Sequence, residues 1–133
     1  MRILVLMVIS LSLFACKLDL EDEFHVEKIP AYNILMPDNC VLNTETNIPF
    51  DYNLPNACYE FFNIEYDEID RFTRIITPYA MVENSQVCTD IYREETYNLN
   101  VTLTQEGVYR FKFWTGETST GITQYEEREL VIN

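Results

Sequence analysis

The sequence predicts an all-β domain, built as a sandwich of about seven strands. Three observations favour this class. Segments in which apolar and polar side chains alternate recur along the chain, turn residues separate them at intervals of about 8 to 15 residues, and no segment after Cys16 has the periodicity of a long helix. Apolar residues make up 47% of the 133 residues and aromatic residues 14%, which disfavours disorder over most of the length.

Seven segments are expected to form the strands. The first lies between Pro30 and Pro37, which suits a sheet edge, because proline cannot donate a hydrogen bond to a neighbouring strand. Pro78 interrupts the fourth segment, where we expect a bulge or an edge. The segments are Ala31–Met36, Asn47–Leu54, Cys58–Tyr66, Arg71–Val82, Tyr97–Thr104, Val108–Thr115 and Tyr125–Ile132.

Alternation within these strands predicts which side chains form the core. The expected inward residues include Ile48, Phe50, Tyr52, Leu54, Leu99, Val101, Leu103, Tyr109, Phe111 and Phe113. In the third segment one face holds Cys58, Phe62, Ile64 and Tyr66, and the opposite face holds Tyr59 and Phe61. Two sheets must stack to bury such faces, so an immunoglobulin-like β-sandwich is the expected arrangement.

The N-terminus predicts export. Residues 1–15 combine Arg2, a short apolar run and a small final residue, Ala15, which is typical of a cleaved helical signal peptide. The run is shorter than the roughly 20 residues that span a bilayer. We expect three regions: the signal peptide at 1–15, an acidic tether at 16–28 and the folded domain at 29–133.

The motif Leu13-Phe14-Ala15-Cys16 resembles the lipobox of bacterial lipoproteins. Leu13, Ala15 and Cys16 match that motif, and Phe14 stands where it usually has a small residue. The resemblance implies cleavage before Cys16 and acylation of its sulfur and its new amine. Two or three acyl chains would anchor the protein stably in a membrane. Ordinary signal cleavage near Ala15, without a lipid, is the alternative.

Acidic residues follow Cys16 closely, in the run Lys17-Leu18-Asp19-Leu20-Glu21-Asp22-Glu23. In lipoproteins of the Bacteroidetes group, acids at this place resemble a signal for display on the outer face of the outer membrane. The alternative is a solvated tether that holds the domain away from the bilayer. We therefore expect a location in the cell envelope, at the outer membrane, with surface and periplasmic display both open.

The charge of the chain excludes some partners. The formal net charge is −13, with 22 acidic and 9 basic residues. Nucleic acid and electrostatic attachment to anionic lipid are disfavoured, because both need clustered Lys and Arg. Membrane contact would come through the lipid on Cys16, and the acidity itself favours solubility.

Cys40, Cys58 and Cys88 remain for pairing if Cys16 carries the lipid. Export permits disulfides. We favour Cys58–Cys88, because Cys58 opens one expected strand and Cys88 follows the next; pairing of Cys40 with either of them is the alternative. The spacings of a zinc site are absent from this set, so neither a metal nor a cofactor is predicted.

Three stretches of the chain, Pro55–Phe61, Cys88-Thr89 and Gly107–Phe113, look like a group of small uncharacterised Bacteroidetes-type lipoproteins with an immunoglobulin-like domain. This resemblance covers most of the chain after the leader. It implies a fold and a location, and it implies no chemistry.

Candidate catalytic and metal-binding residues are few. His25, the single histidine, lies in the expected tether, so a Ser/His/Asp or Cys/His site is not predicted and the chain is expected not to be an enzyme. Glu65, Asp67, Glu68 and Asp70 offer oxygen ligands for calcium but lack the spacing of a calcium loop, and a solvated hairpin tip is the preferred interpretation. Asn100 begins a glycosylation sequon that is idle in a bacterial lipoprotein.

One candidate binding surface is a stripe formed by Arg110, Lys112 and Trp114, which should point outward beside a polar loop. Exposed aromatic rings stack on sugars or anchor protein partners. A tryptophan packed under the loop is the alternative. An exposed Trp114 would favour binding, whereas a buried Trp114 with an exposed apolar edge at Ala31–Met36 would favour assembly by strand addition.

These expectations combine into one functional hypothesis. The chain would be a lipid-anchored, non-enzymatic module of the cell envelope that binds a protein or a glycan. A structural spacer, or a small subunit of an envelope assembly, is the alternative.

Overall fold

Strands make up all the regular structure that the computed structural model describes, which covers residues 23–84 and 87–133. This confirms the all-β prediction, with eight strands where about seven were expected. The strands are β1 (Phe24–Lys28), β2 (Ala31–Tyr32), β3 (Glu45–Leu54), β4 (Tyr59–Glu68), β5 (Thr73–Glu83), β6 (Arg93–Thr102), β7 (Gly107–Glu117) and β8 (Thr123–Ile132). The signal peptide, Cys16 and the first part of the tether lie outside the described residues.

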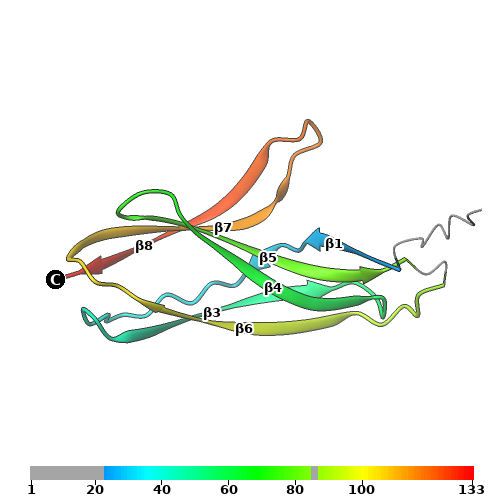
Figure 1. Ribbon diagram of the computed structural model, residues 1–133, viewed down its shortest axis with the longest axis horizontal. Helices are drawn as coiled ribbons and strands as arrows, with labels where there is room; N and C mark the ends of the chain where they lie inside the picture. Colours follow the sequence, from blue (N-terminus) through cyan, green and yellow to red (C-terminus); the bar gives the residue numbers. More distant parts are fainter. Residues whose placement is uncertain (1–22, 85–86) are drawn as a thin grey trace, which may run out of the picture.

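The strands form two packed sheets, visible as two layers in Figure 1. One sheet has β1, β4, β5, β7 and β8, and the other has β2, β3 and β6. The inward faces meet in one core, in which the rings of Phe50 on β3 and Phe113 on β7 lie 5.4 Å apart with neither side chain exposed. The predicted inward faces of β3, β6 and β7 are confirmed, because the side chains expected there are all buried.

Strand β1 corrects the predicted tether at 16–28. Phe24–Lys28 pairs antiparallel with β5, from Phe24 opposite Glu83 to Lys28 opposite Tyr79, so the folded domain begins before residue 29. All five side chains of β1 are exposed. Phe24 and Val26 alternate with His25 and Glu27, so the sequence carries a short strand pattern here, although both apolar side chains are exposed.

Strands β5 and β7 run parallel, from Thr73 opposite Arg110 to Ile76 opposite Phe113. Parallel neighbours need a crossover connection, and here β6, in the other sheet, provides it. This pair departs from the two antiparallel sheets of an immunoglobulin domain. What the structure establishes is thus a two-sheet sandwich with one parallel pair.

A β-bulge in β4 changes the predicted faces of that strand. Phe61 lies opposite Ala80 and Asn63 opposite Tyr79, so Phe62 is the additional residue. Beyond the bulge the alternation continues in the opposite phase, and Phe61 and Ile64 both pack against the core while Phe62 is 50% exposed. The prediction that Phe62 shares a face with Ile64 is therefore wrong.

Pro78 lies in β5 between the segment that pairs with β7 and the segment that pairs with β1. Its carbonyl accepts a hydrogen bond from the Ile29 backbone, 3.0 Å away, on the β1 side. Because the N–H and C=O of one strand residue point to the same side, the missing N–H of Pro78 lies on the β1 side, just beyond the last pair of the β1–β5 ladder, Lys28 opposite Tyr79. The expected bulge occurs in the partner strand β4 instead.

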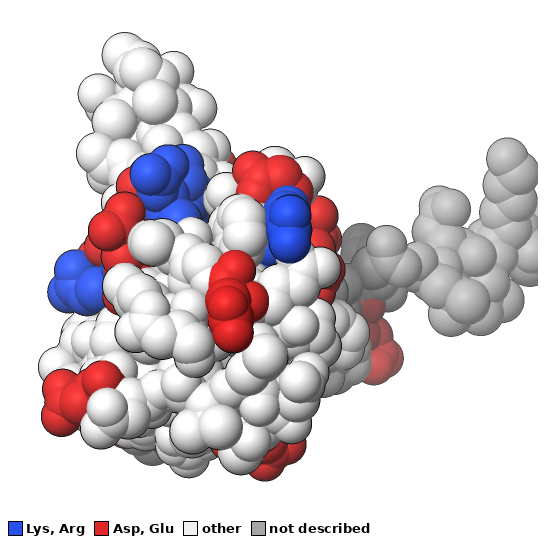
Figure 2. Space-filling model, turned by 90° about the vertical axis from the view of Figure 1, so that its left-hand side faces the viewer, with Lys and Arg blue, Asp and Glu red and all other residues white. Residues whose placement is uncertain are grey.

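The far ends of β7 and β8 continue beyond the sandwich as a hairpin, which projects from the body in Figure 1. The end-on view in Figure 2 shows the same hairpin as a lobe without Lys or Arg. On the face in that view, basic side chains lie beside acidic ones and form no basic patch. Nothing on this face resembles the clustered charge that nucleic acid requires.

Candidate functional site

The predicted stripe on β7 is not an exposed surface. Trp114 is 8% exposed, and the ammonium group of Lys28 lies 5.7 Å from the centre of its ring. Trp114 does point away from Phe113, as the alternation predicts, but β1 and its Lys28 come close on that side. The expectation of an outward, accessible Trp114 is wrong, and the alternative of a packed tryptophan holds.

The two basic residues of the stripe are paired with carboxylates of β8. Lys112 lies 2.9 Å from Glu127, and Arg110 lies 3.8 Å from both Glu127 and Glu129. The Lys112 ammonium group, assisted by Arg110, holds the pKa of Glu127 below its ordinary value. The stripe is therefore neutralised within its own sheet and offers little charge to a partner.

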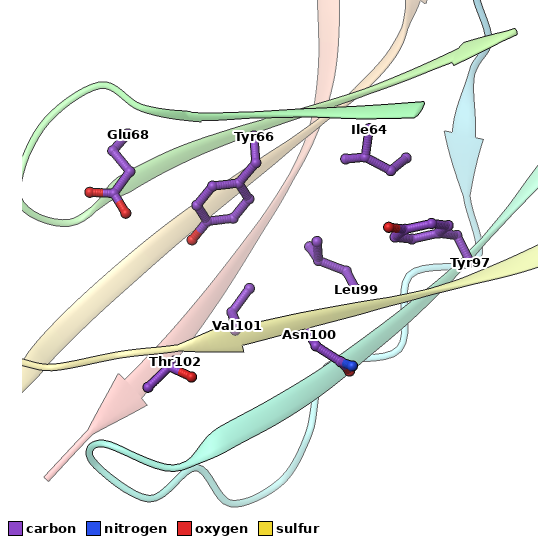
Figure 3. A pocket seen from close by; sticks show the side chains of 8 residues that line it. All are labelled: Ile64, Tyr66, Glu68, Tyr97, Leu99, Asn100, Val101 and Thr102. Carbon is purple, nitrogen blue, oxygen red and sulfur yellow. The ribbon is translucent and has the colours of Figure 1, made fainter. Parts of the chain in front are cut away.

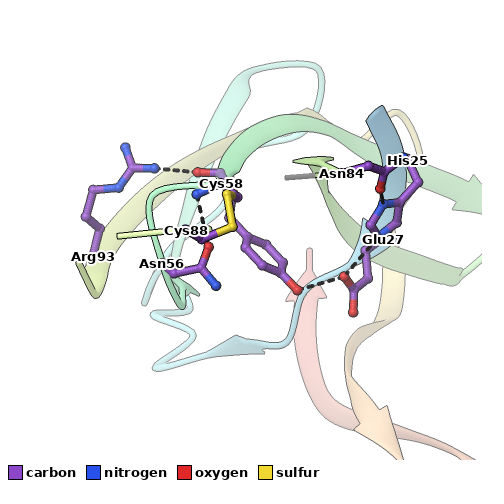
Figure 4. The surroundings of a disulfide bond; sticks show 8 residues. His25, Glu27, Asn56, Cys58, Asn84, Cys88 and Arg93 are labelled. Atoms are coloured by element: carbon purple, nitrogen blue, oxygen red, sulfur yellow. Dashed lines mark hydrogen bonds and ion pairs between the residues drawn. A yellow bond between two sulfur atoms is a disulfide. The ribbon is translucent and has the colours of Figure 1, made fainter. Parts of the chain in front are cut away.

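The cysteine prediction is confirmed. Cys58 and Cys88 form a disulfide with a Cα–Cα distance of 5.5 Å, at the end of the sandwich shown in Figure 4. The same end is braced by the Asn56 side chain, which accepts the Cys58 N–H, and by Arg93, which donates to the Tyr59 carbonyl. Cys40 is free, and its sulfur lies 3.0 Å from the Thr46 hydroxyl.

The acidic turn after β4 is explained by structural contacts. Asp70 accepts the backbone N–H groups of Phe72 and Thr73, both at 2.8 Å, and these bonds lower the pKa of its carboxyl. Glu65 accepts the Tyr79 hydroxyl instead of facing Asp70. No group of three His, Cys, Asp or Glu residues able to hold a metal ion occurs in the described ranges.

Two other candidates also have structural partners. His25 lies within hydrogen-bond distance of Asn84, at 2.6 Å, and within 3.6 Å of Glu27. Asn100 accepts a hydrogen bond from the Asn47 side chain on the neighbouring strand, at 2.7 Å. Each therefore acts as an ordinary surface contact of the sandwich.

A groove of about 330 Å³ lies between β4 and β6, as Figure 3 shows. Strand β4 contributes Ile64, Tyr66 and Glu68, and strand β6 contributes Tyr97, Leu99, Asn100, Val101 and Thr102. The two strands belong to different sheets, so the groove is the open side of the sandwich. We call it the β4–β6 groove.

Both strands that border the β4–β6 groove are sheet edges. Strand β6 pairs with β3 alone and β4 pairs with β5 alone, among the residues that the structure describes. An edge strand carries a row of backbone N–H and C=O groups that are available to another chain. The groove thus combines apolar side chains with two rows of backbone hydrogen-bonding groups.

Contacts connect the two sides beyond both ends of the β4–β6 groove. After Glu68, Arg71 donates a hydrogen bond to the Gln105 side chain. The other end lies at the start of β6. There Arg93 connects β6 to β4 through the Tyr59 carbonyl and through Glu60, at 3.2 Å. Next to this contact, the rings of Phe61 and Tyr97 stack at 5.3 Å. The open part therefore begins near Ile64 and extends towards Glu68.

The charge along the two strands is unequal. Strand β4 carries four carboxylates and no basic residue, whereas β6 has charged residues only in its first three positions, Arg93–Glu95. The seven residues from Thr96 to Thr102 carry neither a charge nor a proline. The carboxylates of β4 are Glu60, Glu65, Asp67 and Glu68.

Two smaller sites were considered. A hollow of about 330 Å³ lies between Glu27, Pro55, Tyr59 and Tyr92, but the Tyr59 hydroxyl already donates to Glu27, at 2.8 Å. A hollow of about 250 Å³ lies on the outer face of the larger sheet beside Phe62. Neither lies along a long, uncharged strand edge like Thr96–Thr102 of β6, so the β4–β6 groove is the stronger candidate.

Hydrogen bonds from tyrosine to carboxylate recur in the sandwich and shift the pKa of the tyrosines. The bonded Glu65 carboxylate is the main cause that raises the pKa of Tyr79 to about 12. Burial, with Glu95 as its bonded acceptor, raises the pKa of Tyr52. These phenols are neutral donors at neutral pH, and none is positioned as a base.

The substitution Tyr79→Phe is expected to make the folded protein less sensitive to alkaline pH. Tyr79 has a folded-state pKa of about 12, whereas an unfolded tyrosine titrates near pH ~10. The stabilisation is therefore complete below pH ~10 and is lost as the pH rises towards ~12. Urea unfolding at several pH values in this range measures the slope. Tyr125→Phe, at an exposed ring of β8, should keep the wild-type slope; an equal slope in Tyr79→Phe would contradict the assignment.

Sequence analysis did not identify the β4–β6 groove. Its apolar lining was predicted, because Leu99 and Val101 alternate with polar residues. Side-chain alternation does not reveal the order of the strands in a sheet, and this order decides whether β6 is a central strand or an edge strand. The absence of charge from Thr96 to Thr102 pointed to a central strand instead, because edge strands usually carry protecting charges.

Comparison with known proteins adds no relative. No helix long and apolar enough to cross a membrane is found at residues 23–84 or 87–133. No protein-family model, curated protein or solved structure matches the chain.

Proposed function

We propose that the chain is an exported, lipid-anchored lipoprotein of the cell envelope, whose sandwich binds a partner protein and performs no catalysis. The β4–β6 groove is the observation that carries the binding proposal. It offers a lining of mixed apolar and polar side chains and an available strand edge at the same place. The immunoglobulin-like relationship and the resemblance to small Bacteroidetes-type lipoproteins belong to the same proposal.

Export is supported by the Cys58–Cys88 disulfide. Stable disulfides form in oxidising compartments and are rare in the cytosol. The leader at 1–15 and the lipobox-like motif ending at Cys16 point to the same route. A periplasmic position and a position on the outer surface both fit these observations.

A protein partner is favoured over a glycan by the position of Trp114. The sugar-binding hypothesis required an exposed ring, and Trp114 is buried beside Lys28. Assembly by strand addition was expected at Ala31–Met36, but Ala31 and Ile34 are buried there and β2 has two residues. The long edge of β6 is therefore the better candidate for strand addition.

The anchoring part of the proposal is tested by Cys16→Ser. We expect the wild type to incorporate labelled palmitate and to fractionate with membranes, and the variant to lose the label and leave the membrane fraction, because each buried methylene contributes roughly 0.8 kcal/mol. Cys40→Ser is the matched control and should behave as the wild type. A wild type without label, or a variant that stays in the membrane fraction, would sink the lipoprotein proposal.

The binding part is tested by photo-crosslinking in cells that export the protein. Thr102→benzoylphenylalanine places the reactive group in the β4–β6 groove, and Ser119→benzoylphenylalanine places it in the β7–β8 hairpin. We expect irradiation to give a discrete adduct of higher mass from position 102 and none from position 119. Adducts from both positions alike, or from neither, would contradict a partner at the groove.

A further inference from the structure

We propose that the β4–β6 groove accepts one extended, cationic segment of the partner protein, which adds as a strand to the edge of β6. This inference rests on the proposed function and specifies the chemistry of its partner. The segment would alternate small or medium apolar side chains, which enter the groove, with Lys or Arg side chains at its rim.

The backbone of β6 supplies the first argument. Its ten residues are paired with β3 along one edge, from Glu45 opposite Thr102 to Leu54 opposite Arg93. Along its other edge no strand is paired, within the described parts of the chain. An added strand would satisfy these backbone groups, which is how strand addition gives affinity.

The lack of protection on β6 is the second argument. Proteins usually guard edge strands with charges, proline or short length. The edge strand β8 carries Glu126–Glu129, β4 carries its four carboxylates and β2 has only two residues. Only the stretch Thr96–Thr102 of β6 is both long and uncharged among the edges of the described sheets. Strand β6 is therefore the edge that a second chain can approach most easily.

The lining of the groove indicates the side chains that would enter it. Leu99 and Val101 form a nearly buried floor from β6, and Ile64 and Tyr66 form a partly exposed wall from β4. Figure 3 shows these side chains pointing towards one another across the gap. Alternate residues of an added strand would point into this space, so a period-two apolar pattern fits it.

The charge around the groove indicates the charge of the partner. Glu68 is the carboxylate that lines the groove, and the buried Arg74 lies 3.7 Å from it. Glu65 and Asp67 alternate to the outer face of the sheet, where Glu65 accepts the Tyr79 hydroxyl. The negative field around the groove therefore comes mainly from the net charge of −13 of the whole chain. Lys or Arg in the added segment would be attracted by this net negative charge, and such complementarity selects partners and speeds their encounter. A second copy of this chain is disfavoured as the occupant, because its net charge is also −13 and β6 offers no positive side chain beyond Arg93.

Defined peptides test the inference directly. The full chain, purified in detergent, is mixed with a seven-residue peptide in which valine alternates with lysine. One comparison peptide has glutamate in place of lysine, and another keeps the lysines but has proline in place of valine. Fluorescence anisotropy measures the dissociation constant, and hydrogen exchange of backbone amides locates the contact.

We expect the valine–lysine peptide to bind and to slow exchange of the β6 amides. The glutamate peptide should bind at least about tenfold more weakly, because like charges oppose it. The proline peptide should also bind at least about tenfold more weakly, because proline cannot donate the ladder bonds. Equal binding of the proline peptide would show electrostatic attraction alone and overturn the inference.

A pair of lysine variants completes the test. Thr102→Lys puts a positive charge on the exposed edge of β6 inside the groove, and Ser119→Lys makes the same change of charge in the hairpin. The first should weaken binding of the valine–lysine peptide at least about tenfold, and the second should leave it unchanged. Equal effects of the two variants, or protection located on another strand, would contradict strand addition at β6.

Failure of this inference can be told from failure of the proposed function. If no peptide binds while the crosslink at position 102 still forms, the partner uses the groove in another way and strand addition is excluded. If palmitate labelling of Cys16 fails while the valine–lysine peptide binds as expected, the anchoring proposal falls and the groove inference stands.

Discussion

Phe113→Ala is expected to lower the free energy of unfolding by about 3–5 kcal/mol, as truncation of a buried Phe generally does. The Phe113 side chain is fully buried, and its ring meets that of Phe50 from the opposite sheet edge-on, at 5.4 Å. Removing the ring leaves a cavity between the two layers, where the surrounding strands can relax only partly. Urea unfolding followed by circular dichroism measures the change.

Val108→Ala is the matched control for Phe113→Ala. It also shortens an apolar side chain of β7, but Val108 is 49% exposed. Its effect should stay below about 1 kcal/mol, because surface substitutions leave no cavity. Similar losses for the two variants would show that the centre of the core does not lie at Phe113.

Removal of the disulfide, by replacing Cys58 and Cys88 together with serine, should lower the free energy of unfolding by about 3–4 kcal/mol on the chain-entropy model. The bond closes a loop with a sequence separation of 30 residues, so its loss gives the unfolded chain much additional freedom. Most of this loss of stability comes from the unfolded state, so the two serines should leave the folded sheets far from this end unchanged. Urea unfolding of the oxidised wild type and the double variant gives the difference.

The control for this prediction is Cys40→Ser. Serine keeps a hydroxyl that can contact Thr46, so stability should change little. A reducing agent should bring the wild type to the stability of the double variant and should leave the double variant unchanged. A double variant as stable as the wild type in oxidising conditions would contradict the prediction.

Several features of the sandwich were predictable because they depend on short segments. The alternation of Leu99, Val101 and Leu103 with polar residues identified both a strand and its buried face. The pairing of Cys58 with Cys88 was favoured because the two cysteines flank consecutive strands, β4 and β5, which lie side by side.

Other features were not predictable, because each depends on residues far apart in the chain. At Phe62 the inward-facing and outward-facing positions of β4 exchange, because β4 pairs with β5 on both sides of the bulge. Trp114 is buried with Lys28 beside its ring, and Lys28 lies 86 positions earlier in the sequence, on a short strand whose side chains are all exposed.

The sequence by itself determined that the folded domain is all-β and which faces of three strands form the core, and it favoured the correct cysteine pair. These properties follow from side-chain alternation and turn residues, which act over a few positions. Only the tertiary structure decided the order of the strands, including the parallel neighbours β5 and β7. That order leaves β4 and β6 as edges that face each other across a groove. A strand edge exists only when strand pairing is complete, so the candidate binding surface could not be seen from the sequence.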